Sequence, residues 1–561
     1  MLIELNIEKK MGIKVLFIDP NIFGMNMITP AIALFSSILK KKGHKVELFD
    51  TTYYPADRDM ESGLKSSNGF GSTKAEDKFD LKPVERKMEK LEAIPFDMAS
   101  RGVKINTTSW RDDLQKKLRK FQPDLIAMCE TESIWELGIM ILQELKDYKI
   151  KNNVPVIVGG GLATFAPDIV SKEKLVDLVC VGEGENALVD LCNKIQNNQD
   201  YSDVTNCWIK KDGKIIKKNP ISKPVDINQN PIIDIDLFEQ NRLYRPMAGT
   251  VYKMFPVETI RGCPYTCRYC SSPDMMNLYK HENKGSYFRK KRADLVSKEL
   301  KYFVSRGAEY FYFWADTFLA MSKKEFEEFC DMYSEIKLPF WIETRPETIN
   351  DYNVRRMAEV GLDRISFGVE HGNEEFRKKI LDKKWSNTHI IEALKIPHKH
   401  GVKFSVYNIT GFPYETKKLA FDTIELNRQF DSDNQNIWCF TPFHGTPLRK
   451  TCEDLGYLKH ETITKTMTAD DTQLNMSQYP PHEIKEIIRC FNLYVKFPKN
   501  RWKEIERAEK NDDEGNRIFN ELKEEFLEKY MPAPNANPNG GIEDFNNYTK
   551  SSKDESKSTA R

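Results

Sequence analysis

Three closely spaced cysteines are the residues of this chain whose types and spacing most directly suggest chemistry. The segment RGCPYTCRYCSSPD, residues 261–274, contains Cys263, Cys267 and Cys270 with the spacing Cys-x3-Cys-x2-Cys. Thiolates are soft ligands that suit iron–sulfur clusters, and three of them leave one iron of a four-iron cluster open to another ligand. Gly262 and Pro264 indicate an exposed loop rather than a core segment. We therefore predict a four-iron cluster on this loop.

Two other interpretations of the three cysteines stay open at this point. A structural zinc site needs four closed ligands, and the nearest histidine in the sequence is His281. Three free thiols in a protein core are the second alternative. The remaining cysteines of the chain are isolated, mostly in apolar surroundings, and in a reducing compartment they behave as small buried hydrophobes.

The composition excludes several classes of protein. The chain has 561 residues, of which 40% are hydrophobic, which is enough for more than one buried core. Lys and Arg number 85 and Asp and Glu 84, so a generally basic nucleic-acid binder is disfavoured. No apolar run reaches the ~18 residues of a membrane span, and the charged first residues do not resemble a signal peptide. We expect a cytoplasmic protein with no membrane span and no specific nucleic-acid partner.

Strand and helix patterns alternate in the first part of the chain, which predicts a parallel sheet covered by helices. The expected elements span residues 14–20, 28–44, 45–50, 109–120, 125–129, 134–146, 155–160 and 178–185. They define an α/β, Rossmann-like domain over residues 1–205. The polar segment 51–108 interrupts it and is either a lid over a site or a disordered insertion. Residues 206–250 read as a β extension and linker, with a hairpin turn at Asp212-Gly213.

A second series of alternating elements begins near residue 251. Strands are expected at 255–260, 309–314, 340–344, 364–370, 403–410 and 436–440, with helical stretches between them. Six such repeats predict a partial (β/α)6 barrel over 251–458, whose chemistry lies at the carboxyl ends of the strands. Residues 459–531 are predicted to form a helical C-terminal region, and 532–561 a disordered tail. The first predicted strand of this barrel ends directly before the cysteine loop.

The cysteine motif, with an aromatic residue at Tyr269, resembles that of radical S-adenosylmethionine (SAM) enzymes. The resemblance implies that Cys263, Cys267 and Cys270 bind a [4Fe-4S] cluster whose open iron is chelated by SAM. In that family, reductive cleavage of SAM gives a 5′-deoxyadenosyl radical. A cellular reductant such as flavodoxin or ferredoxin would supply the electron.

Further segments at predicted strand ends are similar to segments of the same family. They are ADTF (315–318), SFGVEHGN (366–373), NITGFPYET (408–416) and TPFHGTPL (441–448). The resemblance implies SAM contacts by Asp316, Glu370, Gly411 and His444. Asp316 has a second interpretation as a helix cap, and Gly411 as a residue of an ordinary turn. His371, where the family usually has serine, is interpreted as a surface residue, with a proton donor as the alternative.

The first domain resembles the cobalamin-binding domain found in one class of radical SAM enzymes. The similar stretches are residues 28–50, VPVIVGGGLATFAPDIV (154–170) and LVCVGEGENALVDL (178–191). Glycines at strand ends let a large flat ligand approach the backbone, although short turns also use them. The expected cofactor-binding residues are Gly159, Gly160, Gly161, Gly182, Glu183 and Gly184.

One element of many cobalamin domains is missing from this chain. Those domains use Asp-x-His-x-x-Gly, whose histidine ligates cobalt from below. The one histidine before His281 is His44, on an apparent surface turn. If cobalamin binds, we predict that no histidine ligates the cobalt.

These inferences together predict a cobalamin-dependent radical SAM enzyme that methylates an unactivated carbon of an unknown substrate. Two alternatives remain. The first is a radical SAM enzyme without cobalamin that performs cyclisation, rearrangement or methylthiolation. Methylthiolation needs a second cysteine triad in the first domain, but the cysteines there are scattered: Cys129, Cys180, Cys192 and Cys207. The second is an iron–sulfur protein without catalysis, which the strand-end motifs disfavour.

Overall fold

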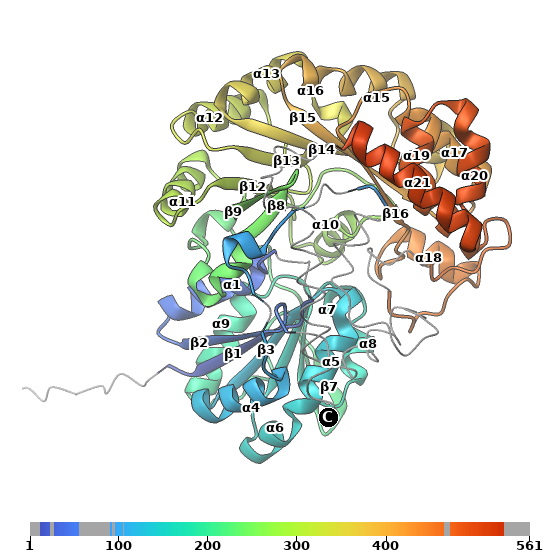
Figure 1. Ribbon diagram of the computed structural model, residues 1–561. Helices are drawn as coiled ribbons and strands as arrows, with labels where there is room; N and C mark the ends of the chain where they lie inside the picture. Colours follow the sequence, from blue (N-terminus) through green and yellow to red (C-terminus); the bar gives the residue numbers. More distant parts are fainter. Residues whose placement is uncertain are drawn as a thin grey trace, which may run out of the picture.

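The chain forms two α/β units and a group of C-terminal helices (Figure 1). The computed structural model describes residues 12–22, 27–54, 90–92, 96–104, 106–464 and 472–531. The predicted tail 532–561 and most of the inserted segment 51–108 lie outside the described residues. Among the described helices, none is both long enough and apolar enough to cross a membrane.

The first unit is built on a seven-stranded sheet with the order β2-β1-β3-β4-β5-β6-β7. Its strands are β1 (Lys14–Asp19), β2 (Lys45–Asp50), β3 (Leu125–Glu130), β4 (Val156–Gly160), β5 (Leu178–Cys180), β6 (Cys207–Lys211) and β7 (Lys214–Lys218). The first five strands are parallel, in the order of flavodoxin-like doubly wound folds. The predicted hairpin at Asp212-Gly213 is present, with positive φ at both turn residues (50° and 74°), and it extends this sheet.

Helices cover both faces of the first sheet, because its strands are apolar on both sides. The helices are α1 (Pro30–Lys41), α4 (Trp110–Phe121), α5 (Trp135–Glu144), α6 (Lys146–Asn152), α7 (Gly161–Phe165), α8 (Pro167–Lys172) and α9 (Glu185–Gln196). α1 and α9 share one buried core, whereas α4, α5, α7 and α8 pack in the core on the opposite face. The carboxyl ends of the parallel strands are left open toward the second unit.

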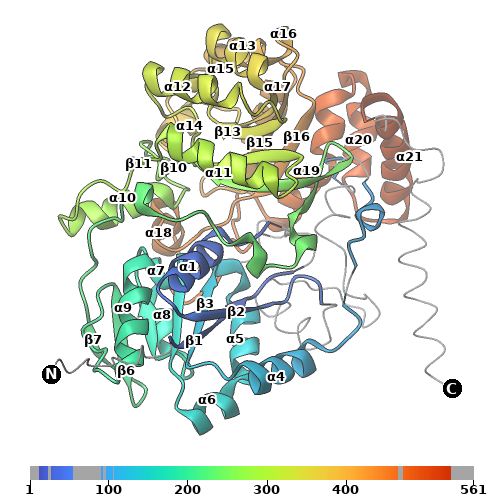
Figure 2. The ribbon, with the colours of Figure 1, turned by 90° about the vertical axis from the view of Figure 1, so that its left-hand side faces the viewer.

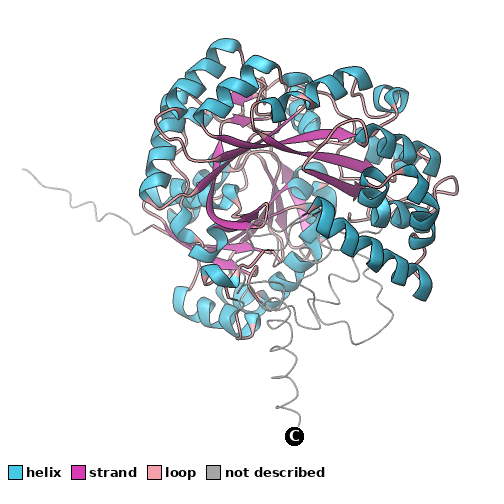
Figure 3. Cartoon of the chain, turned by 45° about the horizontal axis from the view of Figure 1, so that its top comes forward, coloured by secondary structure: helices cyan, strands magenta, loops and turns pink. Residues whose placement is uncertain are grey.

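The second unit is a curved, open sheet with the order β16-β15-β14-β13-β12-β9-β8 (Figure 3). Its strands are β8 (Tyr244–Met247), β9 (Thr250–Glu258), β12 (Tyr310–Trp314), β13 (Phe340–Thr344), β14 (Leu362–Glu370), β15 (Lys403–Thr410) and β16 (Asn434–Cys439). Six strands are parallel and β8 runs antiparallel to β9. The predicted partial (β/α)6 barrel is therefore confirmed. A short separate ladder joins β10 (Ile260–Arg261) to β11 (Arg289–Lys290).

Helices surround the barrel sheet on its convex side (Figure 1). They are α11 (Ala293–Ser305), α12 (Lys323–Tyr333), α13 (Asp351–Val360), α14 (Glu374–Lys379), α15 (Asn387–Leu394), α16 (Ile396–Lys399) and α17 (Lys417–Asn427). In contrast, α10 (Ser272–His281) lies between the barrel and the first unit, where Tyr279 packs with Val181. Strand residues that face α11, α12 and α13, such as Phe311 and Ile365, are fully buried.

The C-terminal helices complete the barrel at the β16 edge, as Figures 1 and 2 show. They are α18 (Pro447–Asp454), α19 (Pro481–Lys496), α20 (Trp502–Ala508) and α21 (Asp513–Tyr530). α19 packs on β16 and α17 within a separate hydrophobic core. The described residues Lys90–Glu92 join this core: Leu91 is buried in it, and the Glu92 Oε1 atom accepts a hydrogen bond of 2.7 Å from the Ile437 backbone N–H.

Candidate active site

The loop with the three cysteines connects β10 to α10. Cys263 and Cys267 are buried and Cys270 is half-buried. The backbone turns sharply at Gly262, where φ is +88° and a Cβ atom would meet the Tyr287 carbonyl oxygen at 2.9 Å. Glycine therefore satisfies both the local conformation and the close approach of the neighbouring backbone.

Each cysteine sulfur has a polar neighbour. Arg345 Nη1 donates a hydrogen bond of 2.9 Å to Cys267 Sγ. Thr317 Oγ1 lies 3.5 Å from Cys263 Sγ, and the Ser272 backbone N–H lies 3.5 Å from Cys270 Sγ. Burial raises the pKa of Cys270 to about 12 and also raises that of Cys263, so these free thiols are protonated at neutral pH. Iron binding would release their protons.

The arrangement of the sulfur atoms bears on the zinc alternative. Among the described residues, one group of three His, Cys, Asp or Glu side chains is close enough to hold a single metal ion, and it consists of His444, Glu453 and His460. The three cysteines do not form such a group, and His281 does not join them. In a four-iron cluster each thiolate binds a different iron, so separated sulfurs fit a cluster better than a single zinc ion.

Glu370 ends β14 at the rim of the barrel in a conformation that is rare for its residue type. Its φ is +73° and its side chain is buried. Lys383 Nζ lies 3.2 Å from Glu370 Oε1, and the Tyr269 hydroxyl is hydrogen-bonded to the same carboxylate. Left-handed backbone at a bulky residue costs free energy and is concentrated at functional sites. The strain therefore supports the prediction of a binding role for Glu370.

Asp316 follows β12 and joins the cysteine loop to the barrel rim. Its Oδ2 atom accepts a hydrogen bond of 2.6 Å from Ser272 Oγ. The side chain reaches solvent within a cavity, although partial burial raises its pKa. It does not cap the next helix, because Ser322 is the N-cap of α12 and accepts from the Glu325 backbone N–H. The interpretation of Asp316 as a helix cap was wrong.

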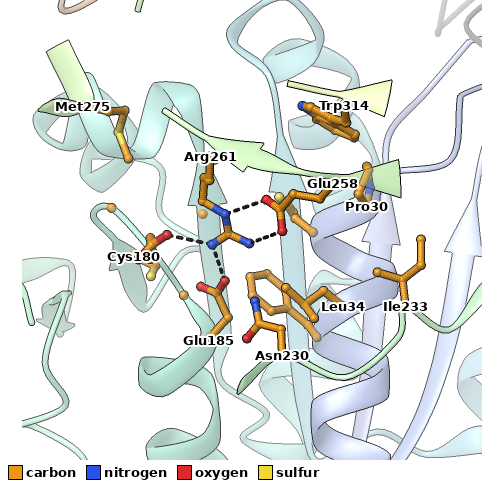
Figure 4. A pocket seen from close by; sticks show the side chains of 18 of the residues that line it. Pro30, Leu34, Cys180, Glu185, Asn230, Ile233, Glu258, Arg261, Met275 and Trp314 are labelled. Atoms are coloured by element: carbon orange, nitrogen blue, oxygen red, sulfur yellow. Dashed lines mark hydrogen bonds and ion pairs between the residues drawn. The ribbon is translucent and has the colours of Figure 1, made fainter. Parts of the chain in front are cut away.

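A cavity of about 430 Å³ connects the first unit to the barrel (Figure 4). On the first unit it is lined by the carboxyl ends of β1, β3, β4 and β5 and by one side of α1. On the barrel it is lined by residues that include Cys270, Trp314 and Asp316. Ligands of doubly wound folds bind at this edge of the sheet, so the cavity lies where a cofactor of the first unit would meet the cysteine loop.

The glycines predicted at the strand ends differ in what the structure requires of them. Gly159 lines the cavity, and the nearest atom to its missing Cβ is Cys180 Cβ at 3.6 Å, so a side chain there would occupy cavity space. Gly160 has φ of +114°, and its Cβ would overlap the Glu130 carbonyl oxygen at 2.0 Å. Gly182 also has positive φ and approaches the Tyr279 hydroxyl. Gly184 lines the cavity, whereas Gly161 does not.

Arg261 connects the two units directly before the first cysteine. Its guanidinium lies 2.7 Å from Glu183 and 2.6 Å from Glu185 of the first unit, and 2.7 Å from Glu258 of β9. Figure 4 shows this group at the cavity wall. Arg289 adds a second guanidinium 2.7 Å from Glu183. The cysteine loop therefore emerges from an ion-pair network that spans both units.

The other end of the same loop is also attached to the first unit. The Tyr279 hydroxyl, on α10, accepts a hydrogen bond of 2.9 Å from the Glu183 backbone N–H. The cysteine loop is thus bounded on both sides by contacts to the segment Gly182–Glu185. Sequence reasoning assigned Glu183 to a cofactor, but its carboxylate is occupied by Arg261 and Arg289 and so acts within the protein.

Comparison with known proteins identifies both units. Residues 257–426 match the model of the Radical SAM superfamily, and residues 90–192 match that of the B12 binding domain. The chain therefore contains a radical SAM domain and a B12-binding domain. An uncharacterized methyltransferase of Pyrococcus horikoshii is 25% identical over 388 residues, which cover 69% of this chain and 81% of the relative. Other relatives are described as an anaerobic magnesium-protoporphyrin IX monomethyl ester cyclase and a putative methylthiotransferase.

Two solved structures share most of this fold. One is the methyltransferase TsrM from Kitasatospora setae with cobalamin and a [4Fe-4S] cluster bound, with a TM-score of 0.58, 15% identity and coverage of 80% of this chain and 79% of TsrM. The other is OxsB with aqua-cobalamin and SAM bound, with a TM-score of 0.60, 14% identity and coverage of 91% of this chain and 71% of OxsB. At these identities the likeness shows the fold.

Two further residues of the radical SAM motifs, His371 and Gly411, both contact Glu415. His371 is fully buried, stacks on Phe376 with ring centroids 4.4 Å apart and lies 3.3 Å from Glu415, so its interpretation as a surface residue was wrong. Gly411 has φ of +85°, and its N–H donates to Glu415 Oε2 at 2.6 Å. Its contact with SAM stays a prediction.

His444 is bound on both sides by protein atoms. Its Nδ1 atom lies 2.7 Å from Glu132 of the B12-binding domain, and its Nε2 atom lies 2.7 Å from the His460 carbonyl oxygen. Asp168 of the B12-binding domain lies 3.1 Å from His460. These contacts attach the segment after β16 to the first unit. A SAM contact by His444 stays a prediction.

The B12-binding domain also contains a motif that sequence reasoning overlooked. Asp19-Pro20-Asn21-Ile22-Phe23-Gly24 has the spacing Asp-x-His-x-x-Gly with asparagine in place of histidine. The Asn21 side-chain amide donates to Thr52 Oγ1 at 2.9 Å, and the Asn21 backbone N–H donates to Thr51 Oγ1 at 2.9 Å. Both contacts direct this residue toward the end of β2. The signal was readable from the spacing alone.

His44 is unsuitable as a replacement for the missing histidine. It directly precedes β2, at the amino ends of the parallel strands, whereas the cavity lies at their carboxyl ends. It is also buried, and burial lowers its pKa. Among the described residues of the B12-binding domain, no histidine lines the cavity.

Proposed function

We propose that this protein is a cobalamin-dependent radical SAM enzyme that methylates an unactivated carbon of its substrate. The observation that carries this proposal is a cavity that is lined by both the B12-binding domain and the cysteine loop. The two sites of such an enzyme must act on one substrate, and the shared cavity brings them together. The Pyrococcus relative supports methyl transfer as the outcome.

The residues present fit the three cofactors of the proposal. Cys263, Cys267 and Cys270 would hold the [4Fe-4S] cluster, Glu370 and Asp316 would contact SAM, and the strand-end glycines would face cobalamin. When bound, these groups supply the electron for SAM cleavage and the methyl group that is transferred. The chain itself binds, orients and excludes water.

Two features of the chain favour these roles. The Arg345 guanidinium beside Cys267 Sγ stabilises the thiolate that a metal requires. The cavity wall is largely apolar on the side of the B12-binding domain, where Phe17, Leu34 and Ile157 line it. An apolar wall keeps water away from a reactive carbon.

The cluster and SAM parts of the proposal are tested together. Anaerobically reconstituted protein should bind about four irons per chain and, once reduced, convert SAM to 5′-deoxyadenosine. Replacing Cys263, Cys267 and Cys270 by alanine should abolish both. Cys330→Ala is the matched control, because Cys330, on α12, is buried in the core and does not line the interdomain cavity. Four irons retained in the triple variant would end the proposal.

The cobalamin part is tested by expression with ample cobalamin. The purified protein should retain the cofactor, and SAM with a deuterated methyl group should label a product only when cobalamin is present. Protein that cleaves SAM but retains no cobalamin would favour the radical SAM enzyme without it. Methylthiolation is not favoured, because Cys192 and Cys207 are fully buried in the core. A cytoplasmic location and a flavodoxin- or ferredoxin-type reductant stay predictions.

A further inference from the structure

The interior of the barrel contains space that solvent reaches. Near its carboxyl end, each of the six parallel strands has at least one inward-facing residue that is not buried; these residues include Glu258, Trp314, Glu343, Gly368, Tyr407 and Trp438. The residues that directly precede them face the helices and are at most 3% exposed. Trp314, in contrast, is 39% exposed. Closed (β/α)8 barrels fill this volume with side chains, so the open interior requires an explanation.

Three of these six residues, Trp314, Tyr407 and Trp438, are aromatic. The Tyr407 and Trp438 rings lie on neighbouring strands with centroids 5.0 Å apart. Trp314 stands on the opposite side, on β12, and Figure 4 shows it beside Glu258 at the interdomain cavity. Gly368 is the register neighbour of Tyr407, and the Glu370 carboxylate lies over it, with Oε1 2.3 Å from the position of the missing Cβ. Aromatic walls bind flat rings through stacking and edge contacts.

Two of the six inward-facing residues are carboxylates, Glu258 and Glu343. The Tyr407 hydroxyl donates to Glu343 Oε1 at 3.1 Å. Among the described residues Glu343 has no ion pair, whereas Glu258 is paired with Arg261 and Glu370 with Lys383. Burial raises the pKa of Glu343, and the nearby Arg245 opposes this shift. A carboxylate that accepts one hydrogen bond has acceptor capacity left for a ligand.

We propose that this interior is the substrate site and takes a flat, nitrogen-containing aromatic ring whose N–H donates a hydrogen bond to Glu343. The proposal rests on the function proposed above, because it presumes a reaction at the barrel mouth. Trp314 and Glu258 line both this interior and the interdomain cavity. A ring stacked in the interior therefore lies next to Asp316 and the cysteine loop, where the reaction would occur.

The test uses reconstituted holoenzyme with SAM and a matched pair of probes, indole and 1-methylindole, measured by calorimetry. The two rings differ by the N–H group. A hydrogen bond to a charged acceptor corresponds to about tenfold or more in affinity, so indole should bind at least tenfold more tightly. Glu343→Ala should lower the affinity for indole to that for 1-methylindole and leave the latter unchanged. Trp438→Ala should weaken both probes.

Glu335→Ala is the control, because Glu335 pairs with Lys301 on the barrel surface. It should change neither affinity. Any of three results would overturn the proposal. Indole and 1-methylindole could bind with equal affinity, Glu343→Ala could change both affinities equally, or neither probe could bind. Cyclohexanol, which has a donor but no flat ring, should not bind. Conversion of SAM to 5′-deoxyadenosine is measured alongside: if it persists while indole fails, the substrate proposal fails alone and the enzyme class stands.

Discussion

Replacement of Arg261 by glutamine tests whether the ion-pair network holds the two units together. The Arg261 side chain is 16% exposed and contacts Glu183, Glu185 and Glu258, which are 4%, 7% and 28% exposed. Removing one partner of a buried ion pair costs about 3–5 kcal/mol, because the remaining charges stay desolvated. Arg289 still neutralises Glu183, so we expect the lower value, about 3 kcal/mol. For a cooperative unit of 150–250 residues this lowers Tm by about 6–12 °C.

The loss should depend on pH in a direction that the structure determines. Burial tends to raise the pKa of Glu183, but the guanidinium groups of Arg289 and Arg261 outweigh it and hold that pKa below its usual value. A lowered carboxyl pKa contributes stability above the unfolded-state value, near 4.5, that is lost as pH falls. Burial raises the pKa of Glu185, and Arg261 opposes the shift. Without Arg261 the Glu185 pKa rises further, so the variant regains stability when this group is protonated.

Differential scanning calorimetry at pH 5 and pH 8 checks both expectations. The difference in Tm between wild type and Arg261→Gln should be largest at pH 8 and smaller at pH 5. Arg292→Gln is the matched control, because Arg292 and Asp294 form an exposed pair, and it should leave Tm unchanged. The double variant with Glu185→Gln should lose less than the sum of the single losses. An Arg261→Gln protein with wild-type Tm at pH 8, or with the same loss at both pH values, refutes this reasoning.

Three further outcomes are expected. Glu370→Ala should raise the dissociation constant of SAM about tenfold or more by removing a charged acceptor, as equilibrium dialysis would show; an unchanged constant would remove Glu370 from the site. The cobalt(II) form of the cobalamin-loaded protein should lack threefold nitrogen splitting in electron paramagnetic resonance. The reason is that Asn21 replaces the histidine of the Asp-x-His-x-x-Gly motif and donates a hydrogen bond to Thr52. A split signal would contradict this expectation. His371→Ala should lower Tm, because it removes a fully buried ring that stacks on Phe376. The expected loss of stability is about 2–5 kcal/mol. A Tm equal to that of the wild type would contradict this expectation.

The sequence by itself determined the elements and the chemistry of the cysteine loop. Runs rich in apolar residues placed the barrel strands within a few residues of their observed bounds, because the strand residues that face the helices must be apolar. Cys-x3-Cys-x2-Cys is a local pattern, so one loop contains all its ligands. The Asp212-Gly213 turn was equally local, because its two positive φ values depend on those residue types.

The tertiary structure alone decided which distant residues meet. Arg261 and Glu183 are 78 positions apart and His444 and Glu132 are 312 apart, and nothing in either neighbourhood indicates its partner. The burial of His371 depends on Phe376 and Glu415 closing around it. Glu343 became a candidate only when the six strands curved around a common interior. Local patterns report backbone preference and ligand type, whereas pairing of charges and formation of cavities depend on how separate elements pack.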